Sequence, residues 1–451
     1  MKRIFFGTLG CLLSLGCLSQ STPPNPSATF PLSVSENQRY LVTAQGSPFL
    51  YQADTPWFLF FKLTMDEVSA YMRIRKAQGF SALQVMLTGG KGLENLYGEL
   101  PFEGDYDLSR PNERFFQRVD SVVMEAQRQE LLLALVPLWS GCCGEDYAGT
   151  DKQGNLLPLN RNGVEKARAY GAWVGQRYGD YDHIMWVLGG DNDPFNALEE
   201  IEAMADGLHR QASNQLFTYH AASTHSSTDV FPEADWLDVS MVYTYFRGFG
   251  KAWNKVQPDV YEVCYDEYRK TPARPFFLGE STYEGEHDAF GSARQVRKQA
   301  YWAMLSGATG HAYGSPNWHL RDNWREVMQY PGARSLQYLP PLMMSVGWPD
   351  LQSDWYGAFV MEGSGGYATN EYVVTAFAPD SSRSITYIPS GRTVRVALSL
   401  LRKKHCQLSW FNPRSGVETP LGSYATTDSP SLTTPDDQDW ILLGRTQSQD
   451  R

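Results

Sequence analysis

Short apolar segments alternate with longer amphipathic ones between positions 48 and 314 of the chain. A short apolar run bounded by turn residues is typical of a strand buried on both faces, and such strands form parallel sheets covered by helices. The pattern predicts strands at 48–54, 81–87, 131–138, 184–188, 216–220, 237–243, 276–280 and 310–314. Eight strands that alternate with helices indicate an α/β fold, the (β/α)8 TIM barrel.

The amphipathic segments carry the signals that begin and end helices. Thr64 and Glu67 form a capping box at the start of one predicted helix, and Gly79 ends it. We expect further helices at 112–129, 162–178, 196–214, 260–269 and 293–306. Residues 331–344 are expected to form a helix and linker that complete a barrel domain at 31–344.

Beyond Leu339 the apolar positions alternate with a period of two, which is typical of half-buried strands. We expect strands at 356–359, 372–376, 384–388, 394–398, 407–411 and 440–443. They predict a small antiparallel β-sandwich domain at 353–445. Its charges are scattered and we expect no aromatic patch on it, so we interpret it as a packing partner of the barrel rather than an independent binding module.

The first residues indicate a processing segment, which we exclude from the fold. Lys2 and Arg3 precede an apolar stretch at 4–15 that is too short to span a bilayer. The sequence up to Cys17 resembles a bacterial lipoprotein signal, so we expect a signal peptide at 1–17, lipidation of Cys17 and a flexible tether at 18–30. Cleavage and secretion without a lipid is the alternative. Either way we expect export to the periplasm or cell surface, with membrane contact only through a lipid anchor.

Acidic and aromatic residues stand where the predicted barrel strands end. All strand ends of such a barrel open into one mouth, so residues far apart in sequence become neighbours there. The mouth is expected to hold Asp54, Trp57, Trp139, Asp191, His220, Tyr243, Tyr245, Glu280, Glu284, Tyr313, Trp318 and His319. A cleft with a few carboxylates and many rings suits a neutral polyhydroxylated substrate, because rings stack on the C–H faces of sugars.

Two of these carboxylates fit the chemistry of glycosidic bond cleavage, which needs one protonated and one ionised carboxyl. We predict Asp191 as general acid/base and Glu280 as nucleophile. The alternatives are that Asp191 only caps a turn, that Glu280 pairs with an arginine, or that Glu284 is the nucleophile. We interpret His220 as a hydrogen-bonding partner of the substrate, and the rings of the mouth as either platform or core.

Composition narrows the function classes further. The net charge of -11 offers no basic face for nucleic acid. No Cys-x-x-Cys or His-x-x-x-His spacing indicates a metal site, so we expect no cofactor and no catalytic metal. A carbohydrate substrate and a monomer are expected. A surface lipoprotein that binds carbohydrate without cleaving it is the main alternative, and an esterase is a weaker one because no Gly-x-Ser-x-Gly elbow is present.

Three motifs resemble the apiosidase-like glycoside hydrolases, family 140. The segment 48–57 (PFLYQADTPW) resembles the opening of that family, and 186–191 (WVLGGD) and 279–285 (GESTYEG) resemble its two active-site motifs. Segments at 387–392, 410–416 and 439–440 resemble the C-terminal module that is named for collagen binding. The resemblance covers nearly the whole chain after the tether.

The resemblance implies a (β/α)8 hydrolase whose acid/base is Asp191 and whose nucleophile is a Glu of the second motif. We also expect Tyr283 of this motif to contact the substrate. Characterised family members release apiose from a branched pectin. This chain has Ser281-Thr282 where Pro-Cys or a similar pair is usual, next to the catalytic acid. Nothing in the residues of the C-terminal module indicates collagen.

Overall fold

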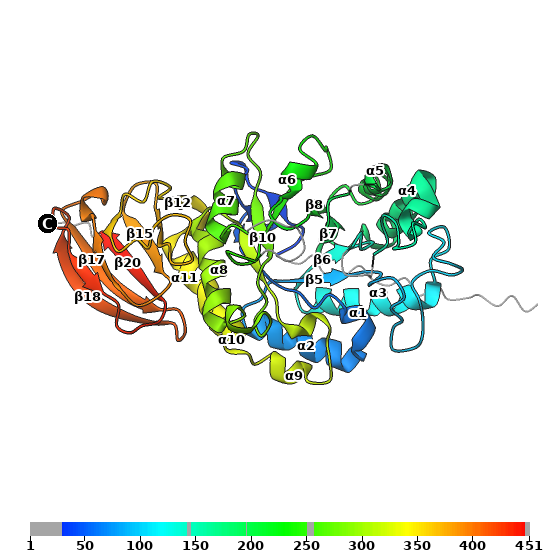
Figure 1. Cartoon of the computed structure of the whole chain (residues 1–451), viewed down its shortest axis with the longest axis horizontal. Coiled ribbons are helices and arrows are strands. Elements are labelled where there is room, and N and C mark those ends of the chain that lie inside the picture. Colours follow the sequence, from blue (N-terminus) through cyan, green and yellow to red (C-terminus); the bar gives the residue numbers. More distant parts are fainter. Residues whose placement is uncertain (1–28, 142–145, 195, 250–256, 447–451) are drawn as a thin grey trace, which may run out of the picture.

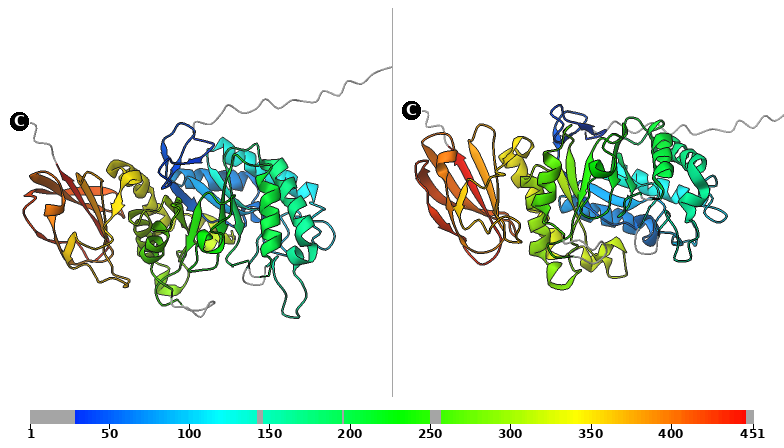
Figure 2. Two further views of the ribbon diagram at one scale, coloured as in Figure 1. Left: turned by 90° about the horizontal axis from the view of Figure 1, so that it is seen from above. Right: turned by 45° about the horizontal axis from the view of Figure 1, so that its top comes forward.

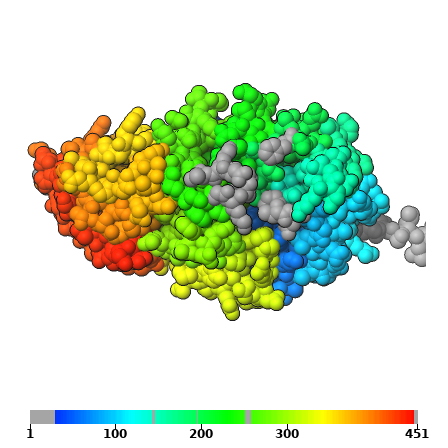
Figure 3. Space-filling view, in the orientation of Figure 1, coloured from blue at the N-terminus to red at the C-terminus, as the bar shows by residue number. Residues whose placement is uncertain are grey.

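The computed structural model describes residues 29–141, 146–194, 196–249 and 257–446. The predicted signal peptide at 1–17, the lipidation site Cys17 and nearly all of the tether at 18–30 lie outside these residues. Within the described ranges, no helix is long and apolar enough to cross a membrane. The molecule is elongated, with the C-terminal domain at one end (Figures 1 and 3).

Eight parallel strands form the barrel, which confirms the predicted fold (Figure 1). Around the barrel each strand lies next to its neighbours in sequence, and β4 pairs with β11. The strands are β4 (Tyr51–Asp54), β5 (Ala82–Met86), β6 (Leu132–Val136), β7 (Ile184–Gly189), β8 (Leu216–His220), β9 (Ser240–Tyr243), β10 (Phe276–Glu280) and β11 (Gly310–Tyr313). Every residue of these strands is buried, as continuous apolar runs require.

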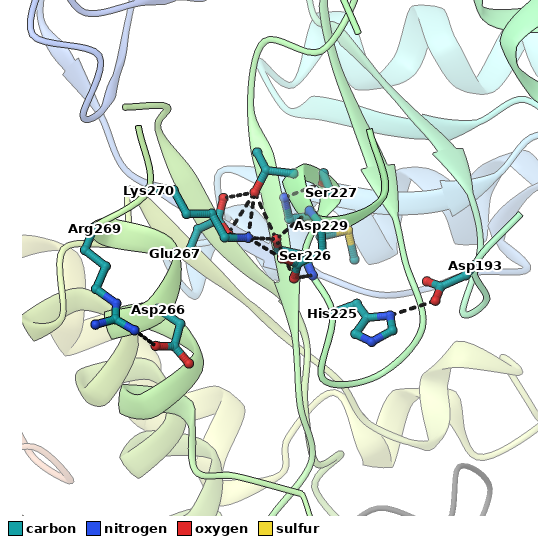
Figure 4. A network of polar contacts seen from close by, with 11 residues as sticks. Asp193, His225, Ser226, Ser227, Asp229, Asp266, Glu267, Arg269 and Lys270 are labelled. Atoms are coloured by element: carbon teal, nitrogen blue, oxygen red, sulfur yellow. Dashed lines mark hydrogen bonds and ion pairs between the residues drawn. The ribbon is translucent and has the colours of Figure 1, made fainter. Parts of the chain in front are cut away.

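Between β8 and β9 the barrel has no strand ladder, and it is joined there by the Asp238 and Val239 amides, which donate to the Phe217 carbonyl at 3.0 and 3.1 Å, and by side chains. Ser227, in the short helix α6 (Ser227–Val230), donates from its hydroxyl to the Tyr219 carbonyl at 2.7 Å and accepts from the Met241 amide at 2.7 Å. Behind α6, the Lys270 ammonium donates to Ser226 Oγ at 2.8 Å and forms ion pairs with Asp229 at 2.6 Å and Glu267 at 2.8 Å (Figure 4). This network fixes the seam of the barrel.

Helices cover the outside of the barrel. They are α1 (Leu59–Lys62), α2 (Met65–Ala77), α3 (Glu113–Arg128), α4 (Pro158–Tyr178), α5 (Leu198–His209), α7 (Val260–Tyr268) and α8 (Ala293–Leu305). The capping box of Thr64 and Glu67 is present at the start of α2, as predicted. Helix α4 begins before the predicted position because Pro158 starts a first turn that a kink at Gly163, φ 72°, separates from the rest.

A small sheet precedes the barrel. It consists of β1 (Ser33–Val34), β2 (Leu41–Val42) and β3 (Pro48–Phe49). Because β3 leads directly into β4, this sheet lies at the amino ends of the barrel strands, opposite the mouth. After β11 come α9 (Trp324–Val327), α10 (Pro331–Ser335) and α11 (Leu339–Val346), which lead to the second domain.

The C-terminal domain is an antiparallel sandwich, as predicted. One sheet has the order β12-β14-β15-β20-β17-β18 and the other β13-β16-β19, and buried residues from both form one core. The strands are β12 (Gln352–Ser353), β13 (Val360–Glu362), β14 (Val374–Phe377), β15 (Arg383–Ile388), β16 (Thr393–Val396), β17 (His405–Asn412), β18 (Val417–Ala425), β19 (Ser431–Thr433) and β20 (Trp440–Thr446).

The prediction of a strand at 356–359 is wrong, since the strand in that region is β13. The sequence pattern also missed β12, β18 and β19. Strand β18 lies at a sheet edge with no fully buried residue, so its side chains lack the apolar alternation that marks a half-buried strand. Pro420 and Gly422 are uncommon inside strands, which makes β18 harder to predict, and the ladder with β17 is irregular beside them.

The two domains share a core along helix α8, which lies between the barrel and the sandwich (Figures 1 and 2). Eleven of the 13 residues of α8 are buried. Arg297 of α8 donates two hydrogen bonds, of 2.8 and 2.7 Å, to the carboxylate of Asp439, next to β20. The rings of Tyr301 and Tyr387 stack with centroids 5.1 Å apart. The sandwich is therefore a packing partner of the barrel.

Candidate active site

A cavity of about 340 Å³ opens at the carboxyl ends of the barrel strands. Two acids predicted as catalytic, Asp191 and Glu280, line it together. Most of the remaining lining is aromatic: the full set is Trp57, Met86, Trp139, Asp191, Tyr245, Glu280, Tyr283, Glu286, Trp318 and His319. The carboxyl face of a barrel is where the enzymes of this fold carry their active sites.

Backbone strain places Asp191 at the wall of this cavity. Strand β7 ends at Gly189, φ 82°, followed by Gly190, φ 139°, and then by Asp191 itself in the left-handed region with φ 49°. A Cβ atom on Gly190 would lie 2.2 Å from the ring of Trp139, so only glycine fits between the strand and this indole. The sharp turn points the next side chain into the mouth.

The loop that carries Asp191 is tied to the loop after β8. Asp193 accepts a hydrogen bond from the Ala222 amide at 3.1 Å and pairs with His225 at 2.7 Å (Figure 4). The Tyr219 hydroxyl donates to the Asn192 carbonyl at 2.9 Å. These bonds hold the position of a residue whose own backbone conformation is unfavourable.

His220 connects the two acids. The buried ring accepts the backbone N–H of Asp191 at Nδ1. A neutral imidazole with an accepting Nδ1 carries its proton on Nε2, so Nε2 donates to Glu280 Oε2 at 2.9 Å. Burial lowers the pKa of His220 to about 4, which keeps the ring neutral. His220 is thus a partner of the protein's own carboxylate, which differs from its predicted role toward a substrate.

The two carboxyls have shifted pKa values. Burial, and after it the charge of Glu280, raise the pKa of Asp191 to about 8. Burial also raises the pKa of Glu280 to about 8, while hydrogen bonds from Tyr283, Tyr245 and Tyr243 lower it. Two nearby carboxyls in a dry site do not ionise together, so one proton stays on the pair at neutral pH.

Hydrogen bonding decides which acid keeps that proton. Glu280 accepts a hydrogen bond from His220, and the hydroxyls of Tyr283, Tyr245 and Tyr243 lower its pKa, so both effects stabilise its charged form. Asp191 is 7% exposed, and its Oδ1 has no hydrogen-bond partner among the described residues. This difference favours the charge on Glu280 and the proton on Asp191.

Aromatic side chains form the walls of the cavity and are themselves held in place. Trp57 donates from Nε1 to the Tyr283 hydroxyl at 2.9 Å, and its ring centroid lies 5.7 Å from that of Trp139. On the other side Trp318 donates from Nε1 to Glu286 Oε1 at 2.8 Å. Fixed rings of this kind provide flat apolar surfaces beside the acids.

Five residues predicted to bind substrate do not line the cavity, namely Asp54, His220, Tyr243, Glu284 and Tyr313. Asp54 is 1% exposed and pairs with Arg75 at 2.6 Å and with Tyr71, both on helix α2. Neighbouring residues of a strand point to opposite sides, and this alternation turns Asp54 outward to the helix layer. It is a buried structural carboxylate that anchors α2.

Glu284 and Tyr313 form a second structural contact outside the cavity. Glu284 accepts the Gly332 amide at 2.7 Å, the Ala333 amide at 3.2 Å and the Tyr313 hydroxyl at 2.7 Å. Its carboxylate therefore caps the start of α10, where free amides favour a negative charge. This leaves Glu280 as the carboxylate of this motif that faces the cavity.

Glu286 and Met86 line the cavity and were missed by sequence reasoning. Glu286 lies six positions beyond the end of β10, in a loop that turns at Gly285 with φ 82°. The density of acids at 280–286 was the available signal, but the sequence does not show which of them turns back. Tyr243 is buried, and its hydroxyl lowers the pKa of both Asp191 and Glu280.

No metal or thiol chemistry is built into the described part of the chain. There, no group of three His, Cys, Asp or Glu side chains is placed to hold a metal ion. Cys264 and Cys406 are buried and free, and Cys142 and Cys143 lie outside the described residues.

Known proteins share this architecture. A crystal structure described as a glycoside hydrolase family 5 protein from Bacteroides vulgatus has a TM-score of 0.81 at 22% identity, with coverage of 94% of this chain and 96% of the other. A structure described as a glycoside hydrolase has a TM-score of 0.80 at 23% identity, with coverage of 93% and 98%. No curated protein matches the chain.

Family models identify both domains. The model "Putative collagen-binding domain of a collagenase" matches residues 364–444. The model "Apiosidase-like, catalytic domain" matches residues 35–350, more than half of the chain. The chain therefore belongs to the apiosidase-like family and is a glycoside hydrolase.

Proposed function

We propose that this chain cleaves a terminal or branching O-glycosidic bond of a complex, plant-type polysaccharide with retention of configuration. Asp191 is the general acid/base and Glu280 the nucleophile. The observation that carries the proposal is the unequal hydrogen bonding of two buried acids in one cavity: Glu280 accepts the Nε2–H of His220 at 2.9 Å and nearby tyrosine hydroxyls lower its pKa, whereas Oδ1 of Asp191 has no hydrogen-bond partner among the described residues. This asymmetry divides the roles that a two-carboxylate mechanism needs.

In the first step the ionised Glu280 attacks the anomeric carbon. A bond forms from its carboxylate oxygen to that carbon, and the bond to the leaving oxygen breaks as Asp191 transfers its proton to it. The donors on Glu280 orient the nucleophile. The buried, charge-coupled position of Asp191 keeps its proton available at neutral pH.

In the second step Asp191 must act as a base. Once Glu280 is esterified its charge is gone, so the charge that raised the pKa of Asp191 disappears and this pKa falls. The ionised Asp191 then takes a proton from water, which attacks the anomeric carbon and releases Glu280. The same carboxyl thereby serves both steps without any movement of the backbone.

The aromatic walls support a neutral sugar as the substrate, since flat rings offer stacking surfaces and no Lys or Arg among the described residues lines the cavity. Apiosides in branched pectin are the first candidates because of the family. The N-terminal sequence supports export and anchoring through Cys17 to a bacterial membrane, at the periplasmic or cell-surface side.

A panel of aryl glycosides, β-apioside included, tests the activity, and azide rescue tests the roles. Glu280→Ala should lose activity and regain it with azide, giving a glycosyl azide of inverted configuration. Glu284→Ala is the matched control, since it removes a neighbouring carboxylate that only caps α10. Rescue in Glu284→Ala alone would reverse the assignment. A fully active Glu280→Ala would refute the mechanism.

A further inference from the structure

A second hollow lies at the junction of the two domains and is walled by aromatic rings. Its rings come from three separate segments: Tyr261 and Tyr265 of α7, Trp355 and Tyr356 before β13, and Tyr367 and Tyr372 before β14. This junction groove has a volume of about 290 Å³. An adjoining hollow of about 430 Å³ shares four of these rings, so the two form one extended depression. The expectation of no aromatic patch on the sandwich is therefore wrong.

Some rings of the junction groove are packed against helix α7, and others are exposed to solvent. Trp355 packs on Tyr265 with centroids 4.7 Å apart, and Tyr372 packs on Tyr261 at 4.7 Å. In contrast, Tyr356 is 95% exposed and Tyr367 is 56% exposed. Large apolar side chains that are left in water next to a fixed aromatic wall mark interaction surfaces.

The polar groups of the groove select an uncharged, hydroxyl-rich ligand. Asp354 is its one acidic residue, and both carboxylate oxygens already accept backbone amides, from Ala358 at 3.0 Å and Phe359 at 2.8 Å. Among the residues that the structure describes, no Lys or Arg lines the groove. Ser306 also lines it, and the buried Ser306 hydroxyl has no hydrogen-bond partner among the described residues. A ligand hydroxyl would satisfy that group.

We propose that the junction groove binds a segment of an uncharged polysaccharide chain, at a site distinct from the catalytic cavity. The two share no lining residue. Tyr356 and Tyr367 stack on sugar rings, and the adjoining hollow continues the path for a neighbouring sugar. The choice of ligand class rests on the proposed function, because a polymer held here is kept near the enzyme that cleaves it. Both domains build the groove, so the sandwich alone does not form it.

Affinity electrophoresis in native gels tests this proposal. The probes are arabinoxylan and galactomannan, both uncharged, each cast in the gel, with gelatin as a proline-rich comparison. At least one polysaccharide should retard the Asp191→Asn chain, which retains the groove and does not consume the gel. Tyr356→Ala combined with Tyr367→Ala in that chain should weaken the retardation roughly tenfold. Tyr97→Ala, an exposed tyrosine outside both sites, is the matched control.

The outcomes separate this inference from the proposed function. Retardation that needs Tyr356 and Tyr367 supports the groove even if no aryl glycoside is hydrolysed. Retardation that is unchanged in the double variant, or that no polysaccharide produces, overturns it even if the enzyme is active. Retardation by gelatin alone would assign the groove to a proline-rich chain and overturn it too. Full hydrolysis of aryl glycosides by the double variant in the otherwise native chain checks that the catalytic cavity is intact.

Discussion

Replacement of His220 tests whether Glu280 depends on its hydrogen-bond donors. The imidazole fills a buried position between β8 and β10 and donates to Glu280 Oε2 at 2.9 Å. His220→Phe keeps most of the volume and removes the donor. A nucleophile that attacks as a carboxylate should then be harder to ionise and worse oriented, although neither acid has been altered.

The size of the effect follows from the type of bond that is lost. A hydrogen bond to a charged group contributes about 1.5–3 kcal/mol. Since 1.36 kcal/mol is tenfold in rate, kcat/KM should fall about 10- to 150-fold. Loss of a donor to the charged form raises the pKa of Glu280, so the acidic limb of the pH profile should move to higher pH. The alkaline limb, set by the proton of Asp191, should move less.

The assay is the pH dependence of kcat/KM on an activated aryl glycoside, with thermal unfolding measured in parallel. His311→Phe is the control: this histidine is also buried on a barrel strand with a lowered pKa, and its ring contacts Gln52 instead of an acid. His220→Gln retains an N–H donor near the Nε2 position and should recover part of the activity. If His220→Phe keeps its acidic limb and loses less than about threefold, Glu280 does not depend on this donor.

Three further predictions concern the acid, the interface and export. Asp191→Asn should greatly slow hydrolysis of substrates with poor leaving groups and spare activated aryl glycosides. The pKa of Asp191 is raised to about 8 in the folded wild type, so the wild type loses stability as pH rises toward this value. The substitution removes this loss, so it should raise the melting temperature more at pH 9 than at pH 5. Asp439→Asn should cost about 3–5 kcal/mol in the free energy of unfolding because it leaves Arg297 buried without its carboxylate, and Arg297→Met combined with Asp439→Leu should recover most of this in denaturant melts. Labelled fatty acid should mark the wild type and not Cys17→Ser in a bacterial host, and equal labelling would refute the anchor.

The barrel could be predicted from sequence because its strands are buried on both faces. Such strands are short apolar runs with no competing interpretation at that length, and the turns that bound them carry Gly, Pro and acid. Strand β18 could not be found in this way, since nothing along it is fully buried. The aromatic cluster of the junction groove was equally hard to predict, because each of the three segments contributes only two of its rings.

The candidate site was predictable in position but not in the direction of its side chains. The ends of β7 and β10 identified Asp191 and Glu280 as neighbours through the barrel alone. The same reasoning placed Asp54 and Tyr313 in the mouth, where the alternation of the strand turns both away. A shift of one residue along a strand decides whether its last side chain faces the cavity or the helices. Where both faces of a strand are buried, the apolar pattern does not indicate which face a residue is on.

The energetically unfavourable features of this site are concentrated at Asp191, so the surrounding structure must hold this residue in place. Asp191 has a left-handed backbone, follows two glycines that no other residue could replace, and keeps a buried oxygen without a partner. Each of these features is unfavourable by itself, and strain of this kind persists only where neighbouring structure enforces it. That structure is the neutral His220, which receives the Asp191 amide and steadies Glu280 with the same ring. One imidazole therefore holds both the backbone of Asp191 and the carboxylate of Glu280, and the roles that we propose for the two carboxyls depend on the ends of β7, β8 and β10 together.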